Sequence, residues 1–258
     1  MVTRRSRWTS CCRRSIEYLV PLPPHSHVRV REAPTYVETL RMYLNSAKTR
    51  NVDAYRELHR SDDRYGKSSH KLRRAMLFAI VSGLRCDKDW RPATILDFGC
   101  GKSTVVFAVA SALRLQPFRY DPAIPEYQNL PVETADIVLN TDVLEHLDED
   151  ELDLILDDIS GLSLRCFFNI STRPASKTLP SGENAHATVK PKLFWEQKLS
   201  HYFPQVHDIS FQDDAATFVT WKLTDPRKQK LISALSGQRL AQLHLSVELA
   251  LRGAIRRL

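Results

Sequence analysis

Apolar residues change their spacing about one third of the way along the 258-residue chain. Before residue 94 they recur at helical spacing, and Leu72, Met76 and Ile80 share one face of a predicted helix. From Thr94 onward, short apolar runs alternate with helical stretches, which is typical of parallel strands joined by helical crossovers. We expect strands at 94–98, 118–121, 136–141, 166–172, 206–211 and 217–223, and helices at 103–113, 150–160 and 191–202.

The segments on either side of this alternating region complete the predicted architecture. Helices are expected at 36–47 and from Ser68 or Ser69, as N-cap, to Leu84. The last two strands are only a few residues apart, so they should form an antiparallel hairpin at the edge of an otherwise parallel sheet. Residues 32–225 would then be one α/β domain with helices on both faces, between a tail at 1–31 and a helix at 226–258.

Positive charge is concentrated at the two ends of the chain. Residues 1–31 carry seven Arg against one Glu, and residues 226–258 carry seven Lys or Arg against one Glu, so each end contributes +6. Because the total is +7, the middle has a net charge of −5. An acidic middle argues against a nucleic-acid partner, since proteins that bind nucleic acids place positive charge around their clefts.

Each basic end has its own interpretation. The tail at 1–31 is expected to be disordered, with a targeting presequence as the alternative. The helix at 226–258 has an apolar stripe for packing or homodimer formation, and its basic end would allow weak contact with a membrane surface.

Composition indicates a soluble protein of the cytoplasm. Hydrophobic residues make up 43% of the chain and charged residues 26%, and no apolar run approaches the roughly 20 residues that span a bilayer. The cysteines form neither a CxxC pair nor a paired framework, which favours reduced thiols. They are Cys11, Cys12, Cys86, Cys100 and Cys166.

The strongest chemical signal is ILDFGCGKS at 95–103, between a predicted strand and a predicted helix. Gly99 lets the backbone turn sharply, and Gly101 lets it approach a ligand closely. The N–H groups at the start of the next helix attract a carboxylate. Asp97 suits a ligand with an ammonium group, and the missing third glycine of GxGxxG disfavours an NAD-linked oxidoreductase.

Two further segments follow at informative spacings. Asp121 ends the next strand, 20 residues after Gly101, where an acid can accept hydrogen bonds from ribose hydroxyls. The alternative is that Asp121 and Pro122 merely begin a turn. In ADIVLNTDVLEHLDEDEL, an apolar strand ends near Asp142 and an acidic helix start follows.

Together these three segments resemble class I S-adenosylmethionine-dependent methyltransferases, over about residues 55–223. The resemblance implies a Rossmann-like fold, S-adenosylmethionine as cofactor, and a strand end near Asp142 that passes beside the sulfonium. The expected cofactor-binding residues are Tyr65, Gly66, Asp97, Gly99, Cys100, Gly101, Lys102, Asp121, Pro122, Asp142, Val143 and Leu144.

Less specific sequence patterns indicate the class of methyl acceptor. The segments YGKSSHKL, CGKS and LPSGENAHATVKPKLFW look like those of bacterial enzymes linked with carbohydrate or surface-polysaccharide modification. This similarity implies O-methylation of a small hydroxylated acceptor such as a sugar or glycan. The alternatives are N- or O-methylation of another small metabolite, and a non-catalytic protein that binds S-adenosylmethionine.

One segment departs from the family pattern. Only 14 residues separate Asp121 from Asp136, and three of them are prolines. A further strand and helix, with an acid that contacts adenine, would not fit there. We therefore expect a shortened sheet on that side, with the turn at Tyr65-Gly66-Lys67-Ser68 closing over the cofactor in compensation.

Two histidines are candidates for a general base. His146 directly follows the segment expected beside the methyl group, and His186 lies in a long polar segment at 173–192 that suits a lid or acceptor site. A purely structural role is the alternative for both. Arg173, Asn184 and Lys190 are candidates for holding a hydroxylated or anionic acceptor.

The remaining aromatic and imidazole side chains are expected to be structural. Trp195 is assigned to the core rather than to a sugar face, and His70 and His201 receive no chemical role. No metal site is predicted, because no His, Asp and Glu residues show ligand spacing on one element. Glu145 and His146 are a weak exception.

Overall fold

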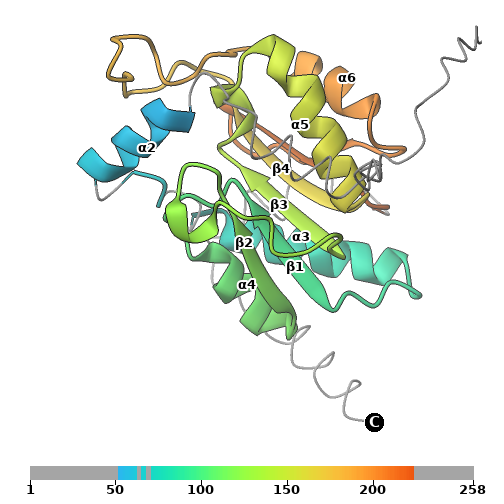
Figure 1. The fold of residues 1–258 in the computed structure, drawn as a ribbon. Helices are drawn as coiled ribbons and strands as arrows, with labels where there is room; N and C mark the ends of the chain where they lie inside the picture. Colours follow the sequence, from blue (N-terminus) through green and yellow to red (C-terminus); the bar gives the residue numbers. More distant parts are fainter. Residues whose placement is uncertain (1–51, 63–64, 68–70, 224–258) are drawn as a thin grey trace, which may run out of the picture. The chain divides into compact units, whose positions relative to one another are not determined.

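A six-stranded mixed sheet forms the centre of the part of the chain that the structure describes (Figure 1). In this computed structural model, the described residues are 52–62, 65–67 and 71–223. The strand order is β2-β1-β3-β4-β6-β5. The first four strands are parallel: β1 (Thr94–Phe98), β2 (Gln116–Tyr120), β3 (Ile137–Thr141) and β4 (Cys166–Ser171). The last two, β5 (His207–Asp208) and β6 (Ala215–Val219), form the antiparallel edge hairpin that the sequence predicts.

Helices cover both faces of the sheet (Figure 1). Because alternate residues of a strand point to opposite faces, Ile95 and Ile137 pack on one side while Leu96 and Val138 pack on the other. The first side is covered by α3 (Arg73–Cys86) and α4 (Val105–Leu113), and the second by α5 (Glu149–Leu162) and α6 (Lys192–Ser200). The α/β Rossmann-like fold expected from the sequence is confirmed.

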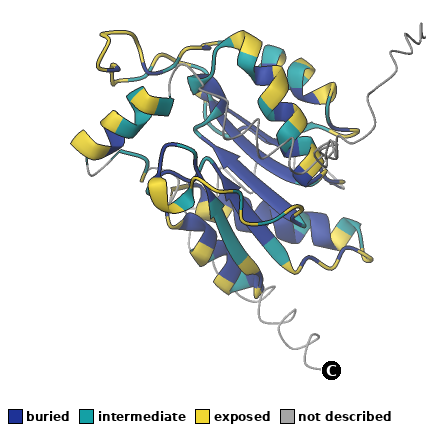
Figure 2. Ribbon diagram, viewed as in Figure 1, coloured by how far each residue is buried: buried dark blue, intermediate teal, exposed yellow. Residues whose placement is uncertain are grey.

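Burial on both faces explains the apolar character of the central strands (Figure 2). All five residues of β3 are buried, as are five of the six residues of β4. Strands covered by helices on both sides read as nearly continuous apolar runs. Each large apolar side chain buried here stabilises the fold by roughly 1.5–3 kcal/mol relative to exposure.

The sheet is short on the side of β2, as the spacing predicts. After β2 the chain makes a single 3-10 turn, η2 (Pro125–Tyr127), and then enters β3 directly. No further strand pairs with β2 among the described residues, so β2 is the edge strand.

Some boundaries differ from the prediction. Helix α2 (Val52–Ser61) was not predicted, and α3 begins at Arg73 rather than at Ser68 or Ser69. Strand β5 is only two residues long, in place of 206–211. It ends early because the Asp208 side chain accepts a hydrogen bond from the Ser210 amide (2.7 Å), which turns the chain.

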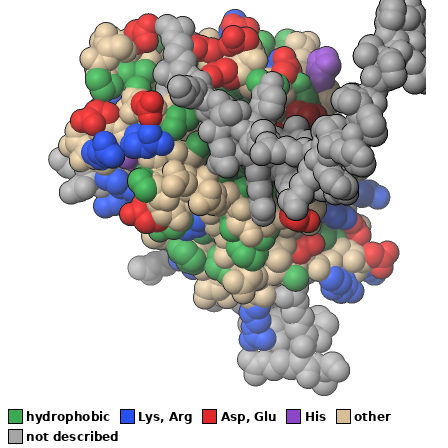
Figure 3. Space-filling model, in the orientation of Figure 1, with side chains coloured by type: hydrophobic (Ala, Val, Ile, Leu, Met, Phe, Trp, Pro, Cys, Tyr) green, Lys and Arg blue, Asp and Glu red, His purple; other side chains and the backbone are tan. Residues whose placement is uncertain are grey.

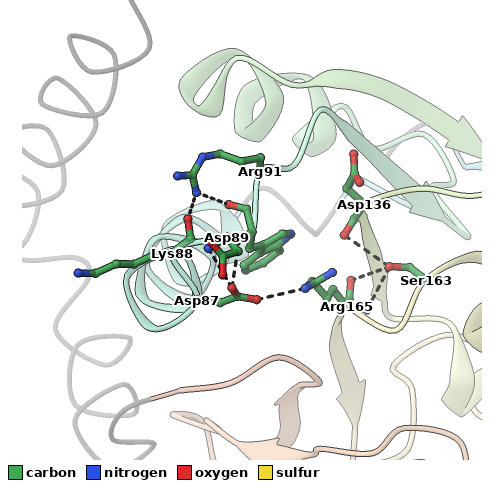
Figure 4. A network of polar contacts seen from close by, with 8 residues as sticks. Asp87, Lys88, Asp89, Arg91, Asp136, Ser163 and Arg165 are labelled. Atoms are coloured by element: carbon green, nitrogen blue, oxygen red, sulfur yellow. Dashed lines mark hydrogen bonds and ion pairs between the residues drawn. The ribbon is translucent and has the colours of Figure 1, made fainter. Parts of the chain in front are cut away.

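A polar network ties the amino ends of the strands together (Figure 4). Asp136, just before β3, accepts hydrogen bonds from the Thr94 amide and hydroxyl, both at 2.9 Å, so it joins β3 to β1. Ser163 donates a long hydrogen bond to the Asp136 carbonyl, and Arg165 forms an ion pair with Asp87 at 3.2 Å. These groups hold strands and lie at the end of the sheet opposite the pocket described below.

Several predictions lie outside the described residues. They are the tail at 1–31, the helix at 36–47, and the helix at 226–258 with its expected roles in dimers and at membranes. None of the helices within 52–62 and 71–223 is long and apolar enough to cross a membrane. On the face drawn in Figure 3, acidic and basic side chains of the described residues are interspersed.

Candidate functional site

A pocket of about 730 Å³ lies at the carboxyl ends of the four parallel strands. This volume falls within the range of roughly 300–1,000 Å³ found for small-molecule sites, and the position is the usual ligand site of open α/β sheets. The residues that follow each strand contribute to it. Of the predicted site residues, the lining includes Tyr65, Gly66, Gly99, Cys100, Gly101, Asp121, Pro122, Asp142, Val143, His146, Arg173 and His186.

The glycine corner forms the first wall of this pocket, which we call the glycine wall (residues 98–101 with Asp121). Gly99 and Gly101 both have positive φ angles, +80° and +49°. A Cβ atom on Gly99 would lie 2.3 Å from Cγ2 of Val143, and one on Gly101 would lie 3.3 Å from Cα of Gly66. The two glycines therefore allow neighbouring segments to pack directly against the loop.

Asp121 supports the glycine wall through both of its carboxylate oxygens. Its Oδ2 accepts a hydrogen bond from the Gly101 amide at 2.7 Å, and its Oδ1 accepts one from the Ala123 amide at 2.8 Å. Only 7% of the residue is exposed, yet it lines the pocket. A carboxylate oxygen can accept more than one hydrogen bond, so ligand binding at Asp121 is compatible with this structural role.

Helix α2 closes over the glycine wall. The Lys102 ammonium donates hydrogen bonds to the carbonyls of His59 (2.5 Å) and Asp62 (3.2 Å) at the end of α2. Lys102 thus binds protein backbone and does not line the pocket. His59 is buried, and its Cε1 would lie only 2.7 Å from a Cβ atom on Gly66. This packing holds the turn at Tyr65 and Gly66 at the pocket.

Two other predicted cofactor residues lie behind the lining rather than in it. Leu144 is fully buried in the core. Asp97 is 1% exposed, and its Oδ2 has no hydrogen-bond partner among the described residues. Burial raises the pKa of Asp97 to about 7, against the opposing effect of nearby Arg119. Their roles in cofactor binding stay predictions.

The second wall comprises Asp142 to His146 and the loop at 185–186, and we call it the histidine wall. Asp142 has a left-handed backbone with φ +56°, a conformation that costs energy for a residue with a side chain. Asn169 on β4 holds it: the Asp142 amide donates to the Asn169 carbonyl (2.8 Å), and Asn169 Nδ2 donates to the Asp142 carboxylate (3.1 Å). Neighbouring strands therefore fix the direction of this carboxylate.

Glu145 is fully buried in the histidine wall. Its Oε1 accepts a hydrogen bond from the Ser171 amide at 2.9 Å, while Oε2 has no partner among the described residues. Burial, together with the nearby Asp142 carboxylate, raises the pKa of Glu145 to about 8. The sequence analysis assigned Glu145 only a weak role, as a candidate metal ligand beside His146, because no His, Asp and Glu residues show ligand spacing on one element.

His146 is held in one orientation by the backbone of the 173–192 loop. Its Nδ1 lies 2.7 Å from the Ala185 carbonyl and 3.1 Å from the Tyr55 hydroxyl. Because a carbonyl can only accept, the ring proton sits on Nδ1 and the lone pair on Nε2. Burial lowers the pKa of His146 to about 4, so the ring is neutral at physiological pH.

His186 lies beside His146 in the histidine wall. The two ring centroids are 4.9 Å apart, and His186 Nδ1 lies 2.6 Å from the Arg173 carbonyl. The same argument places its lone pair on Nε2. A role as general base stays a prediction for each histidine, while their proximity is a structural fact.

Of the three polar residues expected to hold the acceptor, one lines the pocket and two make contacts within the protein. Arg173 lines the pocket and forms an exposed ion pair with Asp214 at 2.9 Å. The Asn184 side chain instead bonds the amide and carbonyl of Ala175, both at 2.9 Å, and so shapes the loop. Lys190 forms an ion pair with Glu149 outside the lining.

The residues expected to be structural lie away from the pocket where they are described. Trp195 is fully buried in the core, as predicted. His201 is exposed and bonds the Gln197 carbonyl of its own helix. His70 falls outside the described residues.

Comparisons with known proteins give no close relative. No protein-family model matches this sequence, and the search of curated proteins finds no match. Among solved structures, the chain is similar to a plantazolicin methyltransferase in complex with SAH, at 15% identity and TM-score 0.43, with 79% of this chain and 87% of that chain covered. A second is the 1,6-didemethyltoxoflavin-N1-methyltransferase of Burkholderia thailandensis, at 16% identity and TM-score 0.42, with 76% and 94% covered.

A third similar structure is the mitomycin 7-O-methyltransferase, at 16% identity and TM-score 0.39. The match covers 56% of this chain and 54% of the mitomycin 7-O-methyltransferase, which is about half of that protein's length. All three TM-scores lie below 0.5, so the arrangement of the strands, rather than these likenesses, defines the fold.

Proposed function

We propose that this chain is an S-adenosylmethionine-dependent methyltransferase that O-methylates a small hydroxylated acceptor, such as a sugar or glycan. The observation that carries the proposal is the convergence of the glycine wall, Asp121 and the Asp142 strand end on one pocket at the carboxyl ends of β1, β2 and β3. These are the three segments on which the sequence resemblance rests.

The pocket suits this cofactor in size and charge. Its volume of about 730 Å³ leaves room for both a nucleoside-sized molecule and part of an acceptor. Asp121 and Asp142 line it, and acidic side chains favour a ligand with a sulfonium and an ammonium group. When bound, S-adenosylmethionine supplies an activated methyl group for direct transfer.

The protein residues then have separate tasks. Asp121 and the glycine wall would hold the sugar and amino-acid parts, and Asp142 would lie near the sulfonium. The turn at Tyr65 and Gly66, packed against Gly101, would exclude water from one side. His146 and His186 would orient the acceptor hydroxyl and take up its proton.

The polar surroundings of the two histidines favour a hydroxylated acceptor. Ser171, Arg173, Lys177 and Gln212 also line this pocket. A site built from hydrogen-bonding groups selects ligands that can satisfy them, since unmatched buried polar groups cost free energy. Sugars present hydroxyls in several directions and meet this requirement.

Two measurements test the proposal. Thermal unfolding of the full chain should shift upward with S-adenosylmethionine and S-adenosylhomocysteine but not with NAD. Release of S-adenosylhomocysteine should then be measured with panels of sugars, phenols and amines. Stabilisation by NAD alone would contradict the cofactor assignment, and turnover confined to amines would contradict the acceptor assignment.

A further inference from the structure

The cluster of Glu145, His146 and His186 has the composition of a metal site. One carboxylate oxygen and one ring nitrogen from each histidine all lie within 4.8 Å of one another. Ligands on opposite sides of one ion are separated by about 4.2 Å, twice a metal–nitrogen distance of about 2.1 Å. Small side-chain rotations would therefore bring all three atoms onto a single ion.

Hydrogen bonds fix the orientation and the protonated nitrogen of both imidazoles, as is usual for metal-binding histidines. Metal-binding histidines usually donate their second N–H to a carbonyl or carboxylate, which fixes the ring and leaves the other nitrogen with its lone pair. His146 meets the Ala185 carbonyl through Nδ1, and His186 meets the Arg173 carbonyl through Nδ1. The lone pairs are thus on the two Nε2 atoms.

The carboxylate supplies a second and independent indication. Glu145 is 0% exposed, and its Oε2 has no hydrogen-bond partner among the described residues. A buried carboxylate oxygen without a partner is costly, and a cation is a group that would satisfy it. The charged neighbour that acts on Glu145 is another carboxylate, Asp142, which strengthens the attraction for a cation.

We propose that Glu145, His146 and His186 bind a divalent transition-metal ion on the acceptor side of the pocket. Two imidazoles and one carboxylate favour Mn²⁺, Fe²⁺, Co²⁺ or Zn²⁺ over Mg²⁺, which prefers oxygen ligands. Three protein ligands leave coordination positions open toward the pocket, as in catalytic metal sites. All three residues line the pocket, so those positions are accessible to an acceptor.

The role of the ion in catalysis rests on the proposed function. A bound divalent ion lowers the pKa of a hydroxyl group and fixes its position. With the ion bound, both imidazole lone pairs serve as metal ligands, so the ion takes the place of the imidazoles in activating the hydroxyl. In the transfer, the acceptor oxygen forms a bond to the methyl carbon, the sulfur–carbon bond breaks with its electron pair staying on sulfur, and the hydroxyl proton passes to solvent water. The ion would thus make the hydroxyl oxygen a better nucleophile.

The test is Co²⁺ binding to the full chain, freed of metal and carrying no histidine tag, followed by visible absorption and calorimetry. We expect one Co²⁺ ion to bind per chain and to give a visible absorption band typical of Co²⁺ with imidazole ligands. Glu145→Gln and His186→Ala should each weaken binding at least roughly 10-fold, since loss of even an outer-shell partner of a metal ligand costs roughly 10- to 100-fold in metal affinity. His201→Ala is the matched control, an exposed histidine outside the pocket, and should bind Co²⁺ unchanged.

The possible results separate this inference from the proposed function. Unfolding curves without metal show whether each variant is folded, and Glu145→Gln keeps the shape of the side chain. Absence of Co²⁺ binding, or equal binding by the wild type and His186→Ala, overturns the ion site even if S-adenosylmethionine still binds. Loss of S-adenosylmethionine binding with Co²⁺ binding intact would overturn the proposed function and leave the ion site standing.

Discussion

The glycine wall and the histidine wall face the same pocket but are built in different ways. The glycine wall is made mainly of backbone: Gly99 and Gly101 turn the chain, and Asp121 binds the Gly101 amide at 2.7 Å. The histidine wall is made of side chains, and the carbonyls of Ala185 and Arg173 orient its two imidazoles. A wall made of backbone suits a cofactor that is always the same molecule. A wall made of side chains can be changed by substitution to suit a particular acceptor.

The two walls also differ in what ties them to the rest of the molecule. The glycine wall is contiguous in sequence except for Asp121, and it is fixed by its own turn and by α2. The histidine wall joins segments about 40 residues apart through hydrogen bonds such as that from the Thr188 amide to the Glu145 carbonyl (3.0 Å). We therefore expect substitutions in the first wall to change cofactor affinity, and substitutions in the second to change turnover.

The largest effect is expected from Gly101→Val. The new side chain would stand at φ +49° and would begin 3.2 Å from His59 and 3.3 Å from Gly66, so the closure of α2 would be lost. Calorimetry should detect no binding of S-adenosylmethionine, a loss of at least roughly 100-fold or about 2.8 kcal/mol.

Gly182→Val is the matched control for Gly101→Val. Gly182 also has a positive φ, +88°, but a Cβ atom there meets nothing within 4 Å. It should therefore carry a similar backbone strain while binding S-adenosylmethionine normally. If both variants lose binding equally, backbone strain rather than the geometry of the glycine wall is responsible.

His146→Ala tests the expectation that substitutions in the histidine wall change turnover. It removes the lone pair on Nε2 and leaves the Ala185 carbonyl without its imidazole partner. We expect kcat to fall by roughly 10²–10³, in the range for loss of a positioned catalytic group, while the Kd for S-adenosylmethionine changes less than about 3-fold. His201→Ala should leave both quantities unchanged. A large change in Kd with kcat preserved would assign His146 to the cofactor instead.

Asp121→Asn is expected to have an intermediate effect. The charge is lost, and an amide can accept from only one of the two backbone donors at Gly101 and Ala123. Loss of a charged hydrogen bond costs about 1.5–3 kcal/mol, so the Kd for S-adenosylmethionine should rise roughly 10- to 100-fold in calorimetry.

Asp136→Asn provides the matched control for Asp121→Asn. Asp136 also accepts hydrogen bonds from two backbone amides, those of Ala93 and Thr94, but it lies at the opposite end of the sheet. Its replacement should lower the melting temperature without changing cofactor affinity. Equal affinities of the two variants would mean that Asp121 acts only as a scaffold.

The sequence allowed much of the glycine wall and of the sheet to be predicted, because both depend on short contiguous patterns. ILDFGCGKS carries its turn and its two glycines within nine residues, and the 14-residue gap after Asp121 correctly predicted the missing edge strand. Lys102 shows the limit of this reasoning. It lies in the motif, yet its ammonium bonds the end of α2, 40 residues or more away, which no local pattern indicates.

The histidine wall was harder to predict for the same reason. Its two histidines are 40 residues apart in sequence and meet only because the loop at 173–192 folds back onto the strand end. Asn184 could equally have faced a ligand, but its side chain is used by the Ala175 backbone. The burial of Glu145 was hidden by the acidic residues that follow it, which lie at the exposed start of α5.

The last prediction concerns the pH dependence of stability and Asp97, which lies behind the glycine wall. Its pKa of about 7 in the folded protein exceeds the ordinary value of 3.8. Between these two pH values the folded state keeps a proton that the unfolded state has lost, so Asp97 lowers stability as pH rises. Relative to the wild type, Asp97→Asn should gain roughly 1.4 kcal/mol per pH unit across this window, measured by chemical unfolding, and the gain should level off above pH 7.

Cofactor affinity should move in the opposite direction to stability in this variant. If the ammonium group of S-adenosylmethionine compensates the charge of Asp97, then Asp97→Asn is the more stable protein without cofactor and the weaker binder with it. Calorimetry at pH 8, where the wild-type carboxyl is ionised, gives the clearest contrast. A variant that binds S-adenosylmethionine as tightly as the wild type would show that Asp97 supports the fold of the glycine wall and does not interact with the ligand. Cofactor binding by the glycine wall would then depend less on the carboxylate of Asp97 than the ammonium hypothesis predicts.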